Sequence, residues 1–167
     1  MTLDKIQKFR EYLDYVERHI LNVQKAWKLI QDKCPRNSDF YFHCDDVEWH
    51  MINDDVKTHD ESKLSAQEFT QYRQNFFPVD GEVKDKIAFA HAWEHHKRHN
   101  MHHWQTWTQS DGHPYASAYL TMNVIDWVAM GFEFGDTAKD YFEKNKEEID
   151  LPQWAVDYMY KIFDAIY

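Results

Sequence analysis

The sequence is poor in the residues that break helices and in those that crosslink chains. Its 167 residues include only four glycines and four prolines, which disfavours a turn-rich β fold and suits a helical protein. Two cysteines, Cys34 and Cys44, could form one pair but no disulfide framework, so we expect a reducing, cytoplasmic setting. No apolar run approaches ~18 residues, and the start, Met-Thr-Leu-Asp-Lys-Ile, lacks an apolar signal region. Neither a membrane span nor a secretion signal is therefore predicted.

Positive charge is scarce as well. The chain has 19 Lys and Arg against 29 Asp and Glu, a formal net charge of −10. This argues against a general nucleic-acid binder, because phosphate backbones attract a cationic surface. It does not exclude a small anionic substrate, which responds to the local field of a pocket. A hydrophobic fraction of 43% is too high for a disordered chain.

Apolar spacing predicts helices through most of the chain. From Ile6 to Ile30 the apolar residues recur at steps of three and four, which is one face of a long helix that Pro35 ends. Further helices are predicted over about 45–58, 65–75, 83–98 and 114–131, from 136 or 137, and from 150–152 onward.

Two local patterns refine this prediction. The sequence Ser65 to Glu68 has the form of a capping box and would open the third helix. The polar segment 105–113 is predicted to be a loop. No linker is long enough to separate domains, so we expect a single all-α domain over 1–167, with six or seven helices.

Histidine is the residue in unusual abundance. Of 11 histidines, five lie between His95 and His103. Helical spacing carries His19, His96 and Asp126 onto or beside apolar faces. A buried carboxylate is costly unless it is paired or bound to a metal. Any one of these residues alone is more often a hydrogen-bonded core residue, but the set, spread over several helices, favours a metal site.

The residue types restrict the kind of metal site. Imidazole and carboxylate together suit first-row metals such as Mn, Fe, Zn, Ni or Co. No Cys-x-x-Cys pair exists, and Glu94-His95-His96 lacks the spacing of the His-Glu-x-x-His zinc motif. Adjacent side chains on a helix diverge by about 100°. His59 and Asp60 therefore share a site only at a helix end or around a binuclear centre.

The order of these residues resembles the HD-domain superfamily of helical metal-dependent phosphohydrolases. The order is His19, His59-Asp60, His95 or His96, His102-His103 and Asp126. His59-Asp-Glu-Ser-Lys63 is similar to the His-Asp-x-x-Lys form of that superfamily, in which the lysine lies near the substrate phosphate. Four segments, His59–Ser65, Ala92–His96, Asn100–Trp104 and Asp126-Trp127, resemble more closely a family of bacterial and phage proteins of unknown function.

The resemblance implies a metal centre and a hydrolytic reaction. A first metal site would use His19, His59, Asp60 and Asp126. His96, His102 and His103 would complete it or hold a second metal bridged by Asp60, with His95 and His99 in reserve. A bound water would become hydroxide near neutral pH and attack phosphorus in a small phosphate ester or nucleotide.

Candidate substrate contacts follow from the same resemblance. Lys63 would bind a phosphate oxygen as a point charge. Arg98 and Lys97 are further candidates for anion contact, against the alternative of a solvated surface. Trp93, Trp104, Trp107 and Tyr115 could form a stacking wall for a nucleobase, against the alternative of ordinary core packing.

Three other hypotheses stay open. The same ligands could hold two irons and oxidise a small substrate with O2. The metal could instead only stabilise the fold of an interaction protein, in which case protein ligands would fill its whole coordination shell. The chain could also be a histidine-rich helical protein without metal, and then a chelator would not lower its thermal stability. The oligomeric state is open.

Overall fold

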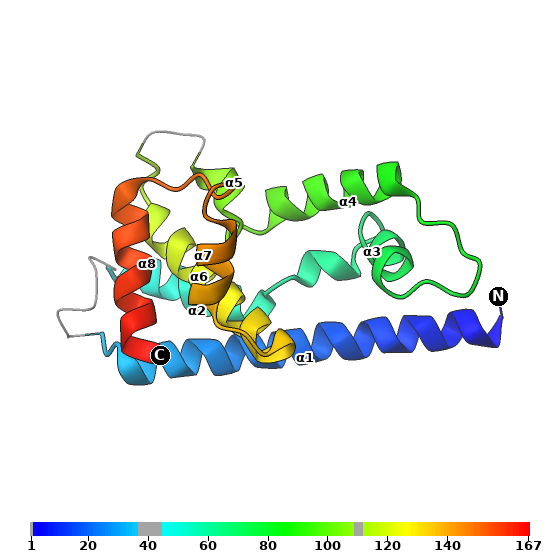
Figure 1. Cartoon of the computed structure of the whole chain (residues 1–167), viewed down its shortest axis with the longest axis horizontal. Coiled ribbons are helices and arrows are strands. Elements are labelled where there is room, and N and C mark those ends of the chain that lie inside the picture. Colours follow the sequence, from blue (N-terminus) through cyan, green and yellow to red (C-terminus); the bar gives the residue numbers. More distant parts are fainter. Residues whose placement is uncertain (1, 37–44, 109–111) are drawn as a thin grey trace.

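The computed structural model describes residues 2–36, 45–108 and 112–167, and within them it is all-helical. It has eight α helices, one 3-10 helix and no strand in these ranges (Figure 1). The predicted all-α class is confirmed. The predicted count of six or seven helices was too low, because the short helix α5 (Trp104–Trp107) forms in and beside the segment expected to be a loop. No described helix is long and apolar enough to cross a membrane.

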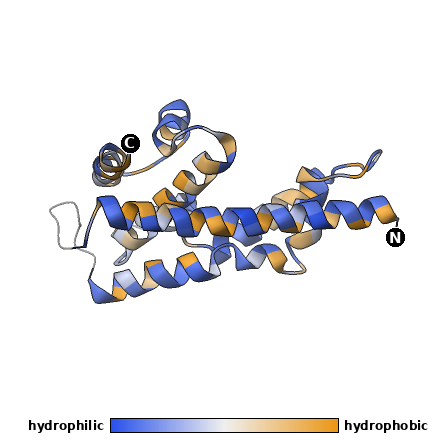
Figure 2. Cartoon of the chain, turned by 90° about the horizontal axis from the view of Figure 1, so that it is seen from below, coloured by the Kyte–Doolittle hydropathy of each residue, from blue (hydrophilic) through white to orange (hydrophobic). Residues whose placement is uncertain are grey.

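Helix α1 (Leu3–Lys33) runs along the whole length of the molecule (Figure 1). Thr2 caps its start by accepting a hydrogen bond from the Lys5 backbone amide at 3.3 Å. Apolar and polar residues alternate along it at helical spacing (Figure 2). Its buried face comprises Tyr12, Val16, His19, Val23, Ala26, Trp27 and Ile30. The predicted apolar stripe is buried at Val16, Val23, Trp27 and Ile30, whereas Leu13, which the spacing also assigned to it, is 44% exposed. His19 lies on the buried face.

The C-terminal half of α1 packs against the larger apolar core. This core is centred on α6 (Ala116–Phe134), which contacts α1, α2 (Asp46–Thr58), α5, α7 (Ala138–Asn145) and α8 (Gln153–Ile166). Helix α6 is buried on nearly all sides, which explains its almost continuous apolar sequence. It ends at Gly135, which adopts a left-handed φ of 81° that glycine takes without strain.

The N-terminal half of α1 carries a smaller group of elements. These are η1 (Glu61–Leu64), α3 (Phe69–Phe76) and α4 (Lys86–His99), which lie together above that half of α1 in Figure 1. The buried apolar residues that they share with α1 are few: Tyr12, Val16, Tyr72 and Ala92. The buried polar residues described below lie between this cluster and the larger core, so two unequal apolar regions flank a polar interior.

The predicted capping box of α3 is wrong. The helix begins at Phe69, and Glu68 precedes it without making a side-chain cap. The Glu68 carboxylate instead accepts hydrogen bonds from His95, His96 and Ser62. A carboxylate that accepts hydrogen bonds from two imidazoles inside the protein is better satisfied there than at an exposed helix start.

Other boundaries lie close to the prediction. Asp45 caps α2 in a capping box with Glu48, and Thr137 caps α7. Helix α4 begins at Lys86, a few residues later than expected, because Asp85 provides the cap. Cys34 is a buried free cysteine. The suggested pairing with Cys44 concerns a residue outside the described ranges, and the single-domain organisation stays a prediction.

Candidate metal centre

The His59-Asp60 doublet stands where α2 ends. Helix α2 stops at Thr58, and Asp60 adopts a left-handed backbone conformation with φ of 59°. Aspartate is among the few residues that tolerate this region. The resulting turn lets both adjacent side chains point inward, which a continuous helix would prevent. Their exposures are 1% for His59 and 2% for Asp60.

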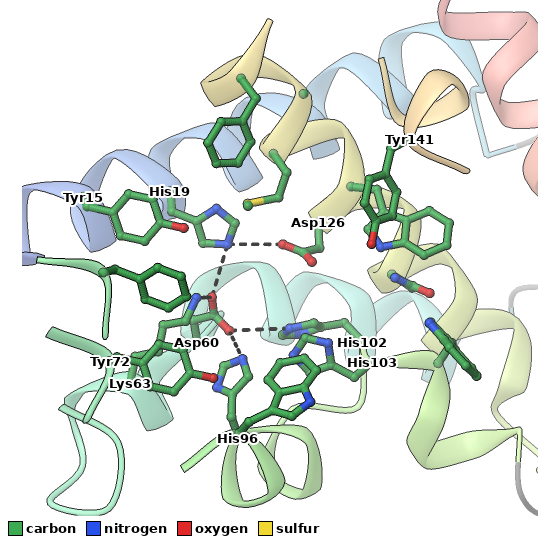
Figure 3. Close-up of a pocket in the computed structure, with 18 of the residues that line it drawn as sticks. Tyr15, His19, Asp60, Lys63, Tyr72, His96, His102, His103, Asp126 and Tyr141 are labelled. Carbon is green, nitrogen blue, oxygen red and sulfur yellow. Dashed lines mark hydrogen bonds and ion pairs between the residues drawn. The ribbon is translucent and has the colours of Figure 1, made fainter. Parts of the chain in front are cut away.

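The other predicted ligands reach the same place from different elements. His19 comes from the buried face of α1, and His96 from the last turn of α4. His102 and His103 follow α4 directly, and Asp126 projects from the middle of α6. Figure 3 shows His19, His96 and His102 directed at the oxygens of Asp60, while Asp126 faces His19 from the other side. Residues far apart in sequence thus form one cluster.

One half of the cluster is the group His19, His59, Asp60 and Asp126, called here the His19 site. The Nε2 atom of His19 lies 3.2 Å from Asp60 Oδ2 and 3.2 Å from Asp126 Oδ1. The Nε2 atom of His59 lies 3.7 Å from Asp60 Oδ2 and 3.5 Å from Asp126 Oδ1. One ligand atom each from His19, His59 and Asp126 falls within 4.8 Å of the others, and Asp60 Oδ2 lies beside both imidazoles.

The other half is the group Asp60, His96, His102 and His103, called here the His96 site. The opposite oxygen of Asp60, Oδ1, lies 3.1 Å from His96 Nε2 and 3.5 Å from His102 Nε2. One ligand atom from each of the four residues falls within 4.8 Å of the others. Asp60 is shared, with one oxygen turned to each site.

The spacing and the polar atoms both fit bound metal ions. Nitrogen and oxygen ligands lie about 2.0–2.2 Å from a transition metal, so neighbouring ligand atoms are about 3–4 Å apart. His59 Nε2, Asp60 Oδ1 and His103 Nε2 are buried and have no hydrogen-bond partner among the residues that the structure describes. Buried polar atoms normally find a partner. Three such atoms around one cluster are accounted for if metal ions are their partners.

Two further carboxylates contact the far ring nitrogens of the candidate ligand imidazoles, and neither was predicted from the sequence. Asp55 Oδ2 lies 3.3 Å from His59 Nδ1, and Asp55 Oδ1 lies 3.5 Å from His102 Nδ1. Glu68 accepts a hydrogen bond from His96 Nδ1 at 2.9 Å. A carboxylate on the far nitrogen fixes the tautomer and orientation of a metal-binding histidine. Asp55 lies one helical turn before His59, and this spacing could have identified it from the sequence as a partner of His59. Glu68 was instead interpreted as part of a capping box.

The electrostatics keep the carboxylates ionised. Burial raises the pKa of Asp60, but the charges of Lys63 and His59 outweigh burial and hold that pKa well below its ordinary value. For Asp126, the nearby imidazoles of His19 and His59 likewise outweigh burial and lower the pKa. Ionised carboxylates are the form that binds metal.

The histidines divide into two kinds. Burial lowers the pKa of His19, but hydrogen bonds to Asp126 and Asp60 outweigh it and raise the pKa to about 9. Burial together with the neighbouring His102 holds the pKa of His103 well below its ordinary value. His103 is therefore neutral, which is the protonation state of a histidine ligand, and at His19 a proton would compete with a metal.

A cavity of about 340 Å³ opens beside the cluster. Lys63 lines it, with Nζ 2.5 Å from Asp60 Oδ2 and a side chain only 11% exposed. Burial lowers the pKa of Lys63, but Asp60 outweighs burial and raises it, so the ammonium stays charged. Trp93 and Trp104 also line the cavity. The centre therefore borders a space large enough for a small molecule.

Six candidate residues do not line this cavity. Lys97 instead pairs with Glu94 at 2.6 Å, and the Nδ1 atom of His99 lies 2.8 Å from the His95 carbonyl oxygen. His95 lies outside the group around Asp60, and Glu68 accepts a hydrogen bond from its Nδ1 at 2.6 Å. Arg98 is exposed on α4, since it lies two positions beyond the inward-facing His96. Trp107 is buried and lines a different cavity, and Tyr115 lies at the start of α6 outside the main one. The proposed ligand His95, the reserve ligand His99 and four proposed substrate contacts are therefore not part of the assembled site.

Comparison with known proteins gives one match. A family model described as a family of unknown function (DUF5662) matches residues 8–163. No curated protein and no solved structure matches the chain.

Proposed function

This chain belongs to the DUF5662 family, whose function is unknown, and we propose that it is a metal-dependent phosphohydrolase of the HD type. Its substrate would be a small phosphate ester, and its cofactor one or two divalent ions of Mn, Fe, Zn, Ni or Co. The observation that carries this proposal is the division of Asp60 between two ligand groups, Oδ2 toward His19 and Oδ1 toward His96. A carboxylate used in this way is suited to bridging two ions.

The residues have separate roles in the proposed reaction. When bound, two such ions would supply an activated water and stabilise charge on the phosphoryl oxygens. Asp55 and Glu68 hold the ligand imidazoles in place. Lys63 presents a buried ammonium at the cavity wall, where it would bind a non-bridging phosphate oxygen and position phosphorus.

The cavity also supports an enzyme over a purely structural metal site. A structural site is closed by protein ligands, whereas a catalytic site keeps a position for water or substrate. His19, Asp60, His96, His102, His103 and Asp126 all line the cavity. An ion that only stabilises the fold does not need access to a cavity.

The first experiment is metal analysis of the untagged protein, followed by phosphatase assays with ribose 5-phosphate and adenosine 5′-monophosphate. We expect one or two metal equivalents and release of inorganic phosphate. Asp60→Asn should lose both, while Asp54→Asn, which changes an exposed neighbour with a side chain 73% exposed, should retain both. Two irons with O2 consumption and no phosphate release would favour the oxygenase hypothesis. Full metal content without any turnover would favour the hypothesis that the metal only stabilises the fold.

A further inference from the structure

The cavity has two chemically different ends. In Figure 3, Lys63 lies on one side of the metal-ligand cluster and Tyr141 on the other, so the cavity extends past the cluster in both directions. The Lys63 end suits a phosphoryl group. The opposite end is not needed for the chemistry of hydrolysis, and its lining indicates what the rest of the substrate is.

The end near Tyr141 is walled by aromatic rings. The rings of Trp127 and Tyr141 pack together with centroids 5.3 Å apart and an interplanar angle of 59°. Trp104 and Trp93 line the same cavity. Aromatic faces bind planar rings by stacking, and they accept many such rings because every base has a π face. The wall therefore suits a planar body rather than a flexible polar one.

One buried amide supplies a polar contact at this wall. Asn123 lies one helical turn before Trp127 on α6 and lines the cavity. It is only 1% exposed, and its Oδ1 atom has no hydrogen-bond partner within the described part of the chain. Leaving a buried acceptor unpaired costs about 1–3 kcal/mol. A donor on the ligand, such as the exocyclic amino group of a heterocycle, would pair with it.

The charges of the lining limit the number of phosphates. Lys63 is the only Lys or Arg among the described residues that line the cavity. Asp136 adds a carboxylate to the lining, beyond the two in the metal-ligand cluster. A second or third phosphate would extend past the cluster with no further cation to bind it. The volume of about 340 Å³ also lies at the low end of the ~300–1,000 Å³ range of small-molecule sites.

We propose that the cavity binds a monophosphate ester with a planar heterocyclic body, of which a nucleoside monophosphate is an example, and that Asn123 selects the ring. The inference rests on the proposed function, which places the phosphate at Lys63 and the metal centre. The ring would stack at the Trp127–Tyr141 wall and donate a hydrogen bond to Asn123.

The test separates ring binding from hydrolysis by using adenosine, which has no phosphate. Calorimetry on the metal-loaded protein should show that adenosine binds and that the 5′-monophosphate binds at least tenfold more tightly than ribose 5-phosphate. Asn123→Leu should weaken adenosine binding about tenfold, the effect of losing one hydrogen bond to a buried partner, with metal content unchanged. Thr121→Val is the matched control, because Thr121 is a buried polar residue of α6 that bonds to Tyr158 and does not line the cavity.

A second variant covers the case in which Asn123→Leu does not fold. Tyr141→Leu changes a residue that is 43% exposed and should also weaken adenosine binding. The proposal is overturned if adenosine does not bind, if neither variant weakens it, or if adenosine triphosphate binds more tightly than the monophosphate. Hydrolysis of ribose 5-phosphate without adenosine binding would remove the ring site and leave the phosphohydrolase proposal standing. Adenosine binding without hydrolysis of any ester would support the ring site and overturn the phosphohydrolase proposal.

Discussion

The protein has two interiors that are buried to the same degree and differ in chemistry. Around α6 and α8 the interior is apolar, and Leu120, Ile125 and Met159 are each 0% exposed. At the metal centre the interior is polar, and His59 and Asp60 are 1% and 2% exposed. The apolar core gains free energy simply from leaving water. The polar centre loses hydration on burial and needs partners to recover it.

This difference matters because the polar centre joins the two ends of the molecule. The small apolar cluster around Tyr12 and Tyr72 is the main other contact that holds α3 and α4 to α1. Four buried residues provide little hydrophobic stabilisation compared with the core around α6. We therefore expect bound ions to stabilise the α3–α4 end much more than the α6–α8 end.

The largest effect should come from changing the residue shared by both metal sites. Asp60→Asn preserves the left-handed backbone, because asparagine tolerates it, and removes the charge that both sites use. We expect metal content to fall below one equivalent and phosphate release to fall by at least about 100-fold. Plasma mass spectrometry and a phosphate assay check this. Unchanged turnover would contradict the assignment of the metal centre.

A change in the apolar core should have the converse result. Met159→Ala removes a side chain that is 0% exposed and should lower the free energy of unfolding by about 3 kcal/mol, because a cavity remains. Metal content per folded molecule should stay the same, since Met159 lies on α8 and contributes to neither site. Urea unfolding and metal analysis measure the two quantities. Leu21→Ala, at an exposed position, is the control.

Removing the ions tests the comparison directly. If ions are present at about 100 times their dissociation constant, a chelator should lower the free energy of unfolding by about 2–3 kcal/mol. Hydrogen exchange should then speed up in α4 more than in α8, because His96 ties α4 to the centre. Equal acceleration in both helices would show that the two interiors are not independent.

The outer carboxylates should distinguish the two metal sites. Asp55→Asn affects a histidine of each site, His59 and His102, so both metal affinities should fall about 10- to 100-fold. Glu68→Gln should weaken only the His96 site by a similar factor, because its other imidazole partner is not a ligand. Stepwise metal titration resolves the two sites. If Glu68→Gln weakened both sites equally, the sites would be one coupled unit.

The fold class and the grouping of most candidate ligands could be predicted from the sequence, because both depend on repeating or ordered patterns. Apolar spacing identified much of the buried face of α1, with His19 beside it. The order of His and Asp residues brought His19, the doublet, His96, His102, His103 and Asp126 into one hypothesis, and the structure places these side chains together.

The features that the sequence did not predict depend on which partners a side chain meets in the folded protein. Sequence spacing allowed either His95 or His96 to face inward. In the structure Glu68 contacts the Nδ1 atoms of both, and it is the Nε2 atom of His96 that lies 3.1 Å from Asp60. The same contacts of Glu68 replace the predicted cap of α3. Asn123 gave no signal, because an asparagine inside an apolar helix becomes informative only when its partners are known.

The smallest expected effect concerns a buried charge that needs no ion. Arg73 is 0% exposed and forms two hydrogen bonds to Glu82, so its charge is balanced within the chain. Glu82→Gln should lower the free energy of unfolding by about 1.5 kcal/mol at pH 7, and a chelator should not alter this cost.

The hydrogen bond from Arg73 lowers the pKa of Glu82 from 4.5 to about 2. Its stabilisation is therefore complete above pH 4.5 and is lost as the pH falls toward 2. Urea unfolding at pH 7 and pH 3 should show the cost of the variant shrinking, whereas Glu11→Gln, at a more exposed ion pair, should change stability by less than about 0.5 kcal/mol at either pH. A cost for Glu82→Gln that grew at low pH would contradict this assignment.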